Sequence, residues 1–87
     1  MTRTILLKGG DRLKMKCEKD EIHLLQTTKH KLQIFVYNEK IELHIPEGFS
    51  YNPKPDQEYI LAAPTGKDVE LIHTCSKVDT DKSKTQN

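Results

Sequence analysis

The sequence predicts an all-β fold, a small antiparallel barrel or sandwich of about six to seven short strands. Apolar and polar side chains alternate with a period of two along most of the chain, most regularly over residues 12–17. Turn-forming residues such as the pair Gly9-Gly10 separate these alternating runs at short intervals. The 3.6-residue apolar period of an amphipathic helix is not found in any segment, so we expect strands throughout.

Seven segments of the chain fit this pattern of alternation or carry a continuous apolar run. In order, the predicted strands are residues 2–8, 12–19, 22–28, 32–37, 41–45, 59–63 and 69–78. The strand at 32–37 is apolar on both faces, which is typical of a strand in the middle of a sheet. Residues 46–58 hold three of the four prolines and therefore predict a long irregular loop.

These strands predict a single β domain over residues 1–78. Residues 79–87 contain no apolar side chain, so we expect them to form a disordered polar tail. The predicted core consists of apolar side chains that share one face of each strand. Its members are Ile5, Leu7, Leu13, Met15, Ile22, Leu24, Leu32, Ile34, Val36, Leu43, Leu61 and Leu71.

The charge and size of the chain restrict the functional classes to which the protein can belong. The 87 residues carry 14 basic and 13 acidic side chains, a formal net charge of +1. This near-neutral balance argues against a dedicated duplex-DNA binder, which is usually strongly basic. The chain holds no apolar run long enough to cross a membrane, and we expect a cytoplasmic protein. A domain this small buries a modest core, so a homodimer is also expected.

The two cysteines allow two interpretations. His73 and Cys75 share one face of a predicted strand, and Cys17 and His23 could complete a Cys2His2 zinc set. The spacing matches no zinc finger, however, and a free cysteine is often a small buried apolar residue. We therefore expect core cysteines, with no metal and no other cofactor.

Sequence motifs of catalysis are missing from the chain. It contains no G-x-S-x-G, no H-E-x-x-H, no Walker loop and no G-x-G-x-x-G. Asp68 and Glu70 share one face of a strand, but such pairs usually form a solvated surface. We therefore predict that the protein is not an enzyme and that it has no catalytic residues.

Exposed aromatic side chains favour a small binding module that acts through protein–protein contacts, with a regulatory role as one possibility. Aromatic residues on loops and exposed strands often anchor a partner protein. The candidate contacts are Phe35 and Tyr37 on the strand with two apolar faces, and Phe49 and Tyr51 in the proline-rich loop. Alternatively, the two loop aromatics fold back and cap one end of the sheet.

A row of basic side chains supports an alternative function, RNA binding. Alternating cations on a hairpin face can follow a phosphate backbone, and the candidate residues are Arg3, Lys8, Arg12, Lys14 and Lys16. The competing interpretation is that these lysines protect an exposed strand from edge-to-edge aggregation. The strand lacks the aromatic side chains that stack on bases, which favours the second interpretation.

Part of the chain weakly resembles the carbon storage regulator family of small RNA-binding dimers. The resemblance rests on Gly10-Asp11-Arg12-Leu13, Asp20-Glu21-Ile22, Leu32-Gln33-Ile34 with Val36, and Glu39-Lys40 followed by Ile41-Glu42-Leu43-His44. It implies an intertwined β dimer that reads GGA in RNA loops. The chain departs from the family at Ile45-Pro46, where the family has an arginine, and after Glu47, where the family has a short helix.

Overall fold

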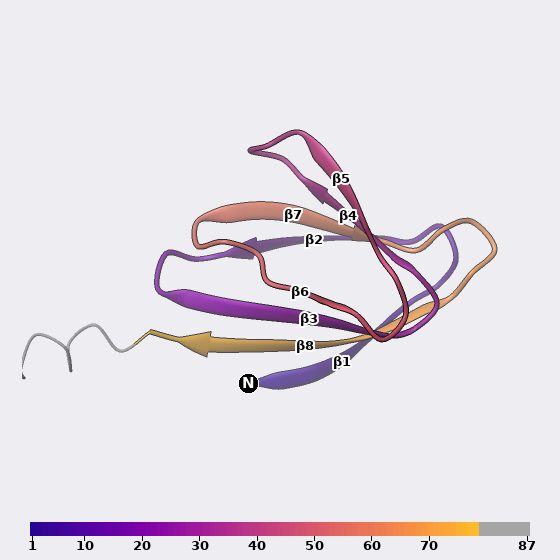
Figure 1. Ribbon diagram of the computed structural model, residues 1–87, viewed down its shortest axis with the longest axis horizontal. Helices are drawn as coiled ribbons and strands as arrows, with labels where there is room; N and C mark the ends of the chain where they lie inside the picture. Colours follow the sequence, from indigo (N-terminus) through magenta and orange to yellow (C-terminus); the bar gives the residue numbers. More distant parts are fainter. Residues whose placement is uncertain (79–87) are drawn as a thin grey trace, which may run out of the picture.

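Eight antiparallel strands form two four-stranded sheets in the computed structural model, which describes residues 1–78 (Figure 1). The strands are β1 (Thr2–Leu7), β2 (Arg12–Cys17), β3 (Glu21–Lys29), β4 (Leu32–Val36), β5 (Ile41–Ile45), β6 (Ser50–Tyr51), β7 (Gln57–Ala62) and β8 (Val69–Lys77). One sheet has the order β1-β8-β3-β6 and the other the order β2-β7-β4-β5. The chain passes from one sheet to the other at every connection except the β4–β5 hairpin.

The predicted all-β fold is confirmed, and the structure adds one strand to the expected number. The added strand is β6, a two-residue pairing with β3 inside the segment that was predicted as loop. All eight strands pair within one chain. The predicted tail, residues 79–87, lies outside the described part of the chain.

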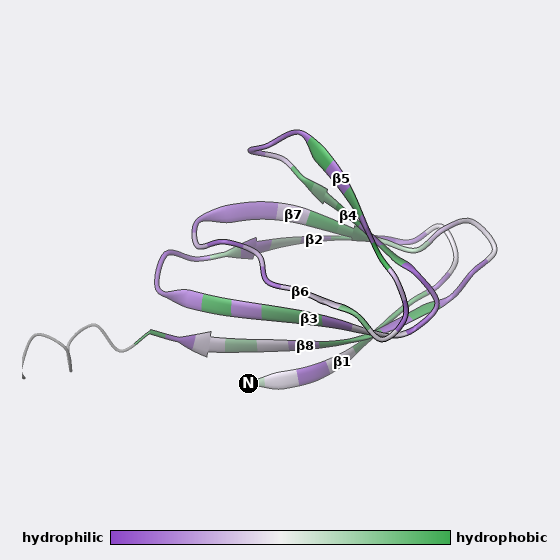
Figure 2. Ribbon diagram, in the orientation of Figure 1, coloured by the Kyte–Doolittle hydropathy of each residue, from purple (hydrophilic) through white to green (hydrophobic). Residues whose placement is uncertain are grey.

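The core fills the space between the two sheets. Polar and apolar residues alternate along the strands, as Figure 2 shows in purple and green. Strand β4 is central in its sheet, between β7 and β5, as its two apolar faces predicted. The core side chains with no exposed surface are Cys17, Leu25, Thr27, Leu32, Ile34, Tyr59, Leu61 and Leu71.

Strand β3 presents the opposite face to the core from the one predicted. Ile22 was expected inside but is 52% exposed, and Leu24 is only partly buried. The residues that point inward are His23, Leu25 and Thr27. A shift of one residue exchanges the two faces of a strand, so the pattern of Ile22 and Leu24 led to the wrong face.

Within residues 1–78, no helix is long and apolar enough to cross a membrane. The expected cytoplasmic location stays a prediction.

Candidate functional site

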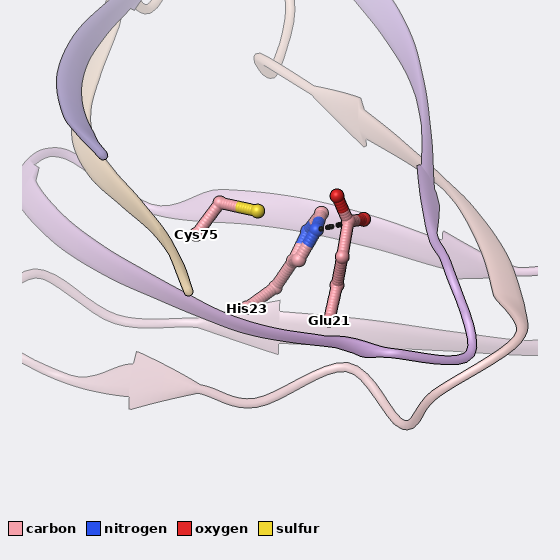
Figure 3. Close-up of side chains that lie close together, drawn as sticks. All are labelled: Glu21, His23 and Cys75. Atoms are coloured by element: carbon pink, nitrogen blue, oxygen red, sulfur yellow. Dashed lines mark hydrogen bonds and ion pairs between the residues drawn. The ribbon is translucent and has the colours of Figure 1, made fainter. Parts of the chain in front are cut away.

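A group of metal-binding side-chain types gathers inside one end of the barrel, where β3 begins and β8 ends. His23 lies directly opposite Cys75 in the β3–β8 pairing, and Glu21 lies two residues before His23, on the same face. One ligand atom from each of the three residues lies within 4.8 Å of the other two. Figure 3 shows the three side chains lying close together. The strand pairing thus joins residues that are about 50 positions apart in the sequence.

Burial and hydrogen bonding shift the pKa values of Glu21 and Cys75 in opposite directions. His23 is only 3% exposed, and its Nε2 lies 3.1 Å from Oε1 of Glu21. The backbone N–H of Glu18 donates to Glu21 at 3.0 Å and lowers the pKa of the Glu21 carboxyl. Burial, reinforced by the neighbouring Glu21 carboxylate, raises the pKa of the Cys75 thiol. Near neutral pH, Glu21 is therefore ionised and Cys75 carries its proton.

A directional chain of hydrogen bonds continues from the group into the core. The guanidinium of Arg3 donates from Nε to Nδ1 of His73 at 3.3 Å. Nε2 of His73 must then carry the proton of the neutral ring, and it lies 3.2 Å from Nδ1 of His23. The same Nδ1 is 2.8 Å from the hydroxyl of Tyr59. His23 therefore accepts at Nδ1 and donates from Nε2 to Glu21.

The Cys2His2 set considered from the sequence is only partly assembled. His23 and Cys75 belong to the group, whereas His73 takes part in the hydrogen-bond chain behind it. Cys17 is fully buried, and its thiol donates to the backbone oxygen of Glu21 at 3.4 Å. Sequence reasoning missed Glu21, although Glu-x-His spacing on a strand places both side chains on one face.

On the outer face of the β2-β7-β4-β5 sheet, residues predicted to bind a protein partner lie beside residues predicted to bind RNA. The guanidinium of Arg12 lies 5.4 Å from the centre of the Phe35 ring, and Nζ of Lys14 lies 5.9 Å from that of Tyr37. Lys16 follows on the same face of β2. The missing aromatic neighbours of the basic row are thus supplied by strand β4 and the residue after it, across the sheet.

The other candidate contact residues lie apart from this face. Arg3 points toward His73 in the interior, and Lys8 forms an ion pair with Asp68 at 3.6 Å. Of the two loop aromatics, Phe49 is 64% exposed, while Tyr51 is half-buried against the core.

Comparisons with known proteins find similarity in structure but not in sequence. No family model and no curated protein matches the chain. A predicted oxalate decarboxylase from Thermotoga maritima superimposes with a TM-score of 0.78 at 11% identity, covering 90% of this chain and 66% of that one. The Cnp3 cupin domain of Schizosaccharomyces pombe gives 0.78 at 13% identity, covering 98% and 60%. The polyketide cyclase RemF of Streptomyces resistomycificus gives 0.72 at 7% identity, covering 99% and 67%.

These neighbours correct the expectation that the protein is not an enzyme. Two of the three are described as enzymes, so missing sequence motifs do not exclude catalysis on this fold. The reason is physical: active sites in such barrels can be assembled from isolated side chains on separate strands, which leave no local motif. Nothing in the comparisons points to RNA binding. At identities this low they establish the fold alone, and that fold is the small cupin-type barrel.

Proposed function

We propose that the protein binds a divalent transition-metal ion of the zinc class through Glu21, His23 and Cys75. The observation that carries the proposal is the gathering of one carboxylate, one imidazole and one thiol, with ligand atoms within 4.8 Å of one another. Zinc accepts oxygen, nitrogen and sulfur ligands, so the chemistry of the donor set fits. The partial exposure of Glu21 and Cys75 leaves a path by which an ion can enter.

The spacing of the three ligand atoms requires only a small adjustment. Metal–ligand bonds of about 2.0–2.3 Å place tetrahedral ligand atoms roughly 3.3–3.8 Å apart. The 3.1 Å between Nε2 of His23 and Oε1 of Glu21 is already close to this range. Three protein ligands leave the fourth position of a tetrahedron free, as in catalytic rather than structural zinc sites. The hydroxyl of Tyr59 lies where it can hydrogen-bond Nδ1 of the coordinating ring.

Cobalt titration of the purified protein tests this function, because a cobalt–thiolate bond gives a charge-transfer band in the near ultraviolet. We expect one ion per chain and a band that disappears in Cys75→Ser. His23→Gln should weaken binding at least tenfold. Cys17→Ser is the matched control, because it removes the other thiol and should keep the band. A wild-type protein that binds no cobalt or zinc at micromolar concentration, or a band that depends on Cys17, would overturn the proposal.

A second function, binding of a protein partner, is favoured by the outer face of the β2-β7-β4-β5 sheet. Tyr37 is 48% exposed there, and its ring and that of Phe35 lie under cations instead of in the core. Aromatic and arginine side chains are frequent energetic centres of protein interfaces. The test is site-specific photo-crosslinking from position 37 in cell extract, with position 49 as the control. Crosslinks that form equally from both positions would count against this face. The homodimer stays a prediction.

A further inference from the structure

A groove crosses the outer face of the β2-β7-β4-β5 sheet, and we call it the outer groove. Its volume is about 470 Å³, and its walls come from all four strands and the turn between β4 and β5. The lining residues that matter here are Arg12, Phe35, Tyr37, Lys40, Ile41 and Ile60. Ile41 is 40% exposed, so the floor of the groove offers apolar surface to a ligand.

The charged side chains around the outer groove are predominantly positive, and the cations are available to pair with a ligand. Within residues 1–78, neither Arg12 nor Lys40 nor the adjacent Lys14 has a carboxylate within ion-pair distance. Arg12 and Lys14 instead lie over aromatic rings. Glu42, the acidic residue of the lining, is hydrogen-bonded to His44. The groove therefore combines an apolar floor with cations that carry no acidic partner of their own.

We propose that the outer groove binds an acidic segment of a partner protein, with one apolar side chain of that segment on the floor. The inference rests on the proposed protein-binding function and is independent of the metal site. The apolar side chain would cover Phe35, Ile41 and Ile60, and flanking carboxylates would pair with the three cations. Charge complementarity of this kind sets partner choice and speeds association.

Two features of the same face favour an acidic protein segment over a nucleic acid. Glu42 lines the groove, and Glu58 lies opposite Lys16 on the same face, so a continuous phosphate backbone would meet two carboxylates. Single-stranded nucleic acids also need open aromatic faces for base stacking, and here cations occupy those of Phe35 and Tyr37. A short segment can instead place its few carboxylates beside the cations alone.

Fluorescence anisotropy with labelled synthetic peptides tests the inference, in the presence of EDTA so that the metal site plays no part. The probe is a nine-residue peptide of glutamates around a central Phe and Leu. Two comparison peptides replace its glutamates by lysines or its Phe and Leu by serines, and a single-stranded RNA of similar length is the fourth ligand. We expect the acidic apolar peptide to bind at least tenfold more tightly than the other three. Its affinity should fall with added salt.

Variants then locate the binding. Arg12→Glu should reduce affinity for the acidic apolar peptide at least tenfold, and Phe35→Ala should reduce it independently of charge. Lys77→Glu makes the same charge change at the end of β8, in the other sheet, and should have little effect.

Each alternative result overturns a distinct part of the argument. Equal binding of the lysine peptide, lost in Phe35→Ala, keeps the protein-binding face but refutes an acidic partner. Tighter binding of the RNA than of any peptide refutes a protein occupant. If no peptide binds, the inference fails, and photo-crosslinking from position 37 still decides whether this face binds a protein at all.

Discussion

Nε2 of His73 lies 3.2 Å from Nδ1 of His23, and the two histidines are only 4% and 3% exposed. Two charged imidazoles at this distance and in this burial would repel each other strongly. The Arg3 guanidinium adds a third positive charge beside His73 and can only donate to it. The two rings therefore lie against each other and beside the Arg3 guanidinium inside the barrel, where a positive charge on His73 is unfavourable.

Acid should destabilise the fold through His73. Burial, reinforced by the charges of His23 and Arg3, lowers the pKa of His73 from 6.5 to about 4, with Glu21 acting weakly in the opposite direction. Between pH 6.5 and 4, His73 is therefore protonated in the unfolded chain but stays neutral in the folded chain. This contribution to the free energy of unfolding should decrease between pH 6.5 and 4, by up to about 3 kcal/mol, and stay level below.

Urea unfolding at a series of pH values measures this dependence. His73→Phe should have a shallower slope between pH 6.5 and 4 than the wild-type protein, whatever its absolute stability. His44→Gln removes a more exposed histidine of β5 and serves as the control variant. Equal slopes for wild type and His73→Phe would show that His73 does not titrate as described.

Metal uptake should release about one proton per ion near neutral pH. The raised pKa of Cys75 keeps its thiol protonated, so coordination must expel that proton, while Glu21 is already ionised. The Nε2 proton of His23 can move to Nδ1, which then donates to the Tyr59 hydroxyl and no longer accepts from His73, so this proton does not leave the protein. Calorimetric titration with zinc in buffers of different ionisation enthalpy counts the protons. Cys75→Ser should release none and Cys17→Ser the normal number; the same count in all three proteins would contradict the assignment.

Leu61 should contribute more to stability than Leu43, although both were expected in the core. Leu61 is fully buried in the central strand β7, where it pairs with Leu13 on one side and Ile34 on the other. Leu61→Ala should therefore cost about 2–5 kcal/mol through the cavity it leaves. Leu43 in the edge strand β5 is partly exposed, so Leu43→Ala should cost less than half as much. Urea midpoints at unchanged m-value give both numbers, and equal losses would argue against this register.

The strands could be predicted from the sequence where apolar and polar residues alternate regularly or where the apolar run is continuous. Residues 41–45 match β5 in full, and the strands at 12–19 and 32–37 extend beyond β2 and β4 by only one or two residues. Strand β6 could not be found this way, because two residues, Ser50 and Tyr51, show no period. The wrong face of β3 has a related cause: its inner face carries the polar residues His23 and Thr27, while Ile22 and Leu24 are apolar on the outer face.

The candidate metal group was less accessible to sequence reasoning than the strands. Its geometry depends on the pairing of β3 with β8, which brings His23 opposite Cys75. A pairing across so many intervening residues leaves no local spacing pattern. Histidine and cysteine were considered as ligands, but Glu21 lies just outside the predicted strand at residues 22–28 and was not considered. The outer groove was missed for the same reason, since strand β7 lies between the basic row of β2 and Phe35 of β4.

Two adjacent threonines of β3 should respond in opposite directions to the same substitution. The hydroxyl of Thr27 is fully buried and has no hydrogen-bond partner among residues 1–78, so Thr27→Val should raise the free energy of unfolding by about 1 kcal/mol. The hydroxyl of Thr28 lies 3.1 Å from the backbone oxygen of Glu70 and 2.8 Å from its Oε2, so Thr28→Val should lower it by about 0.5–1.5 kcal/mol. Chemical denaturation of both variants decides the matter. A loss of stability in Thr27→Val would mean that its hydroxyl is hydrogen-bonded in solution, and therefore that the interior of the barrel admits water beside β3.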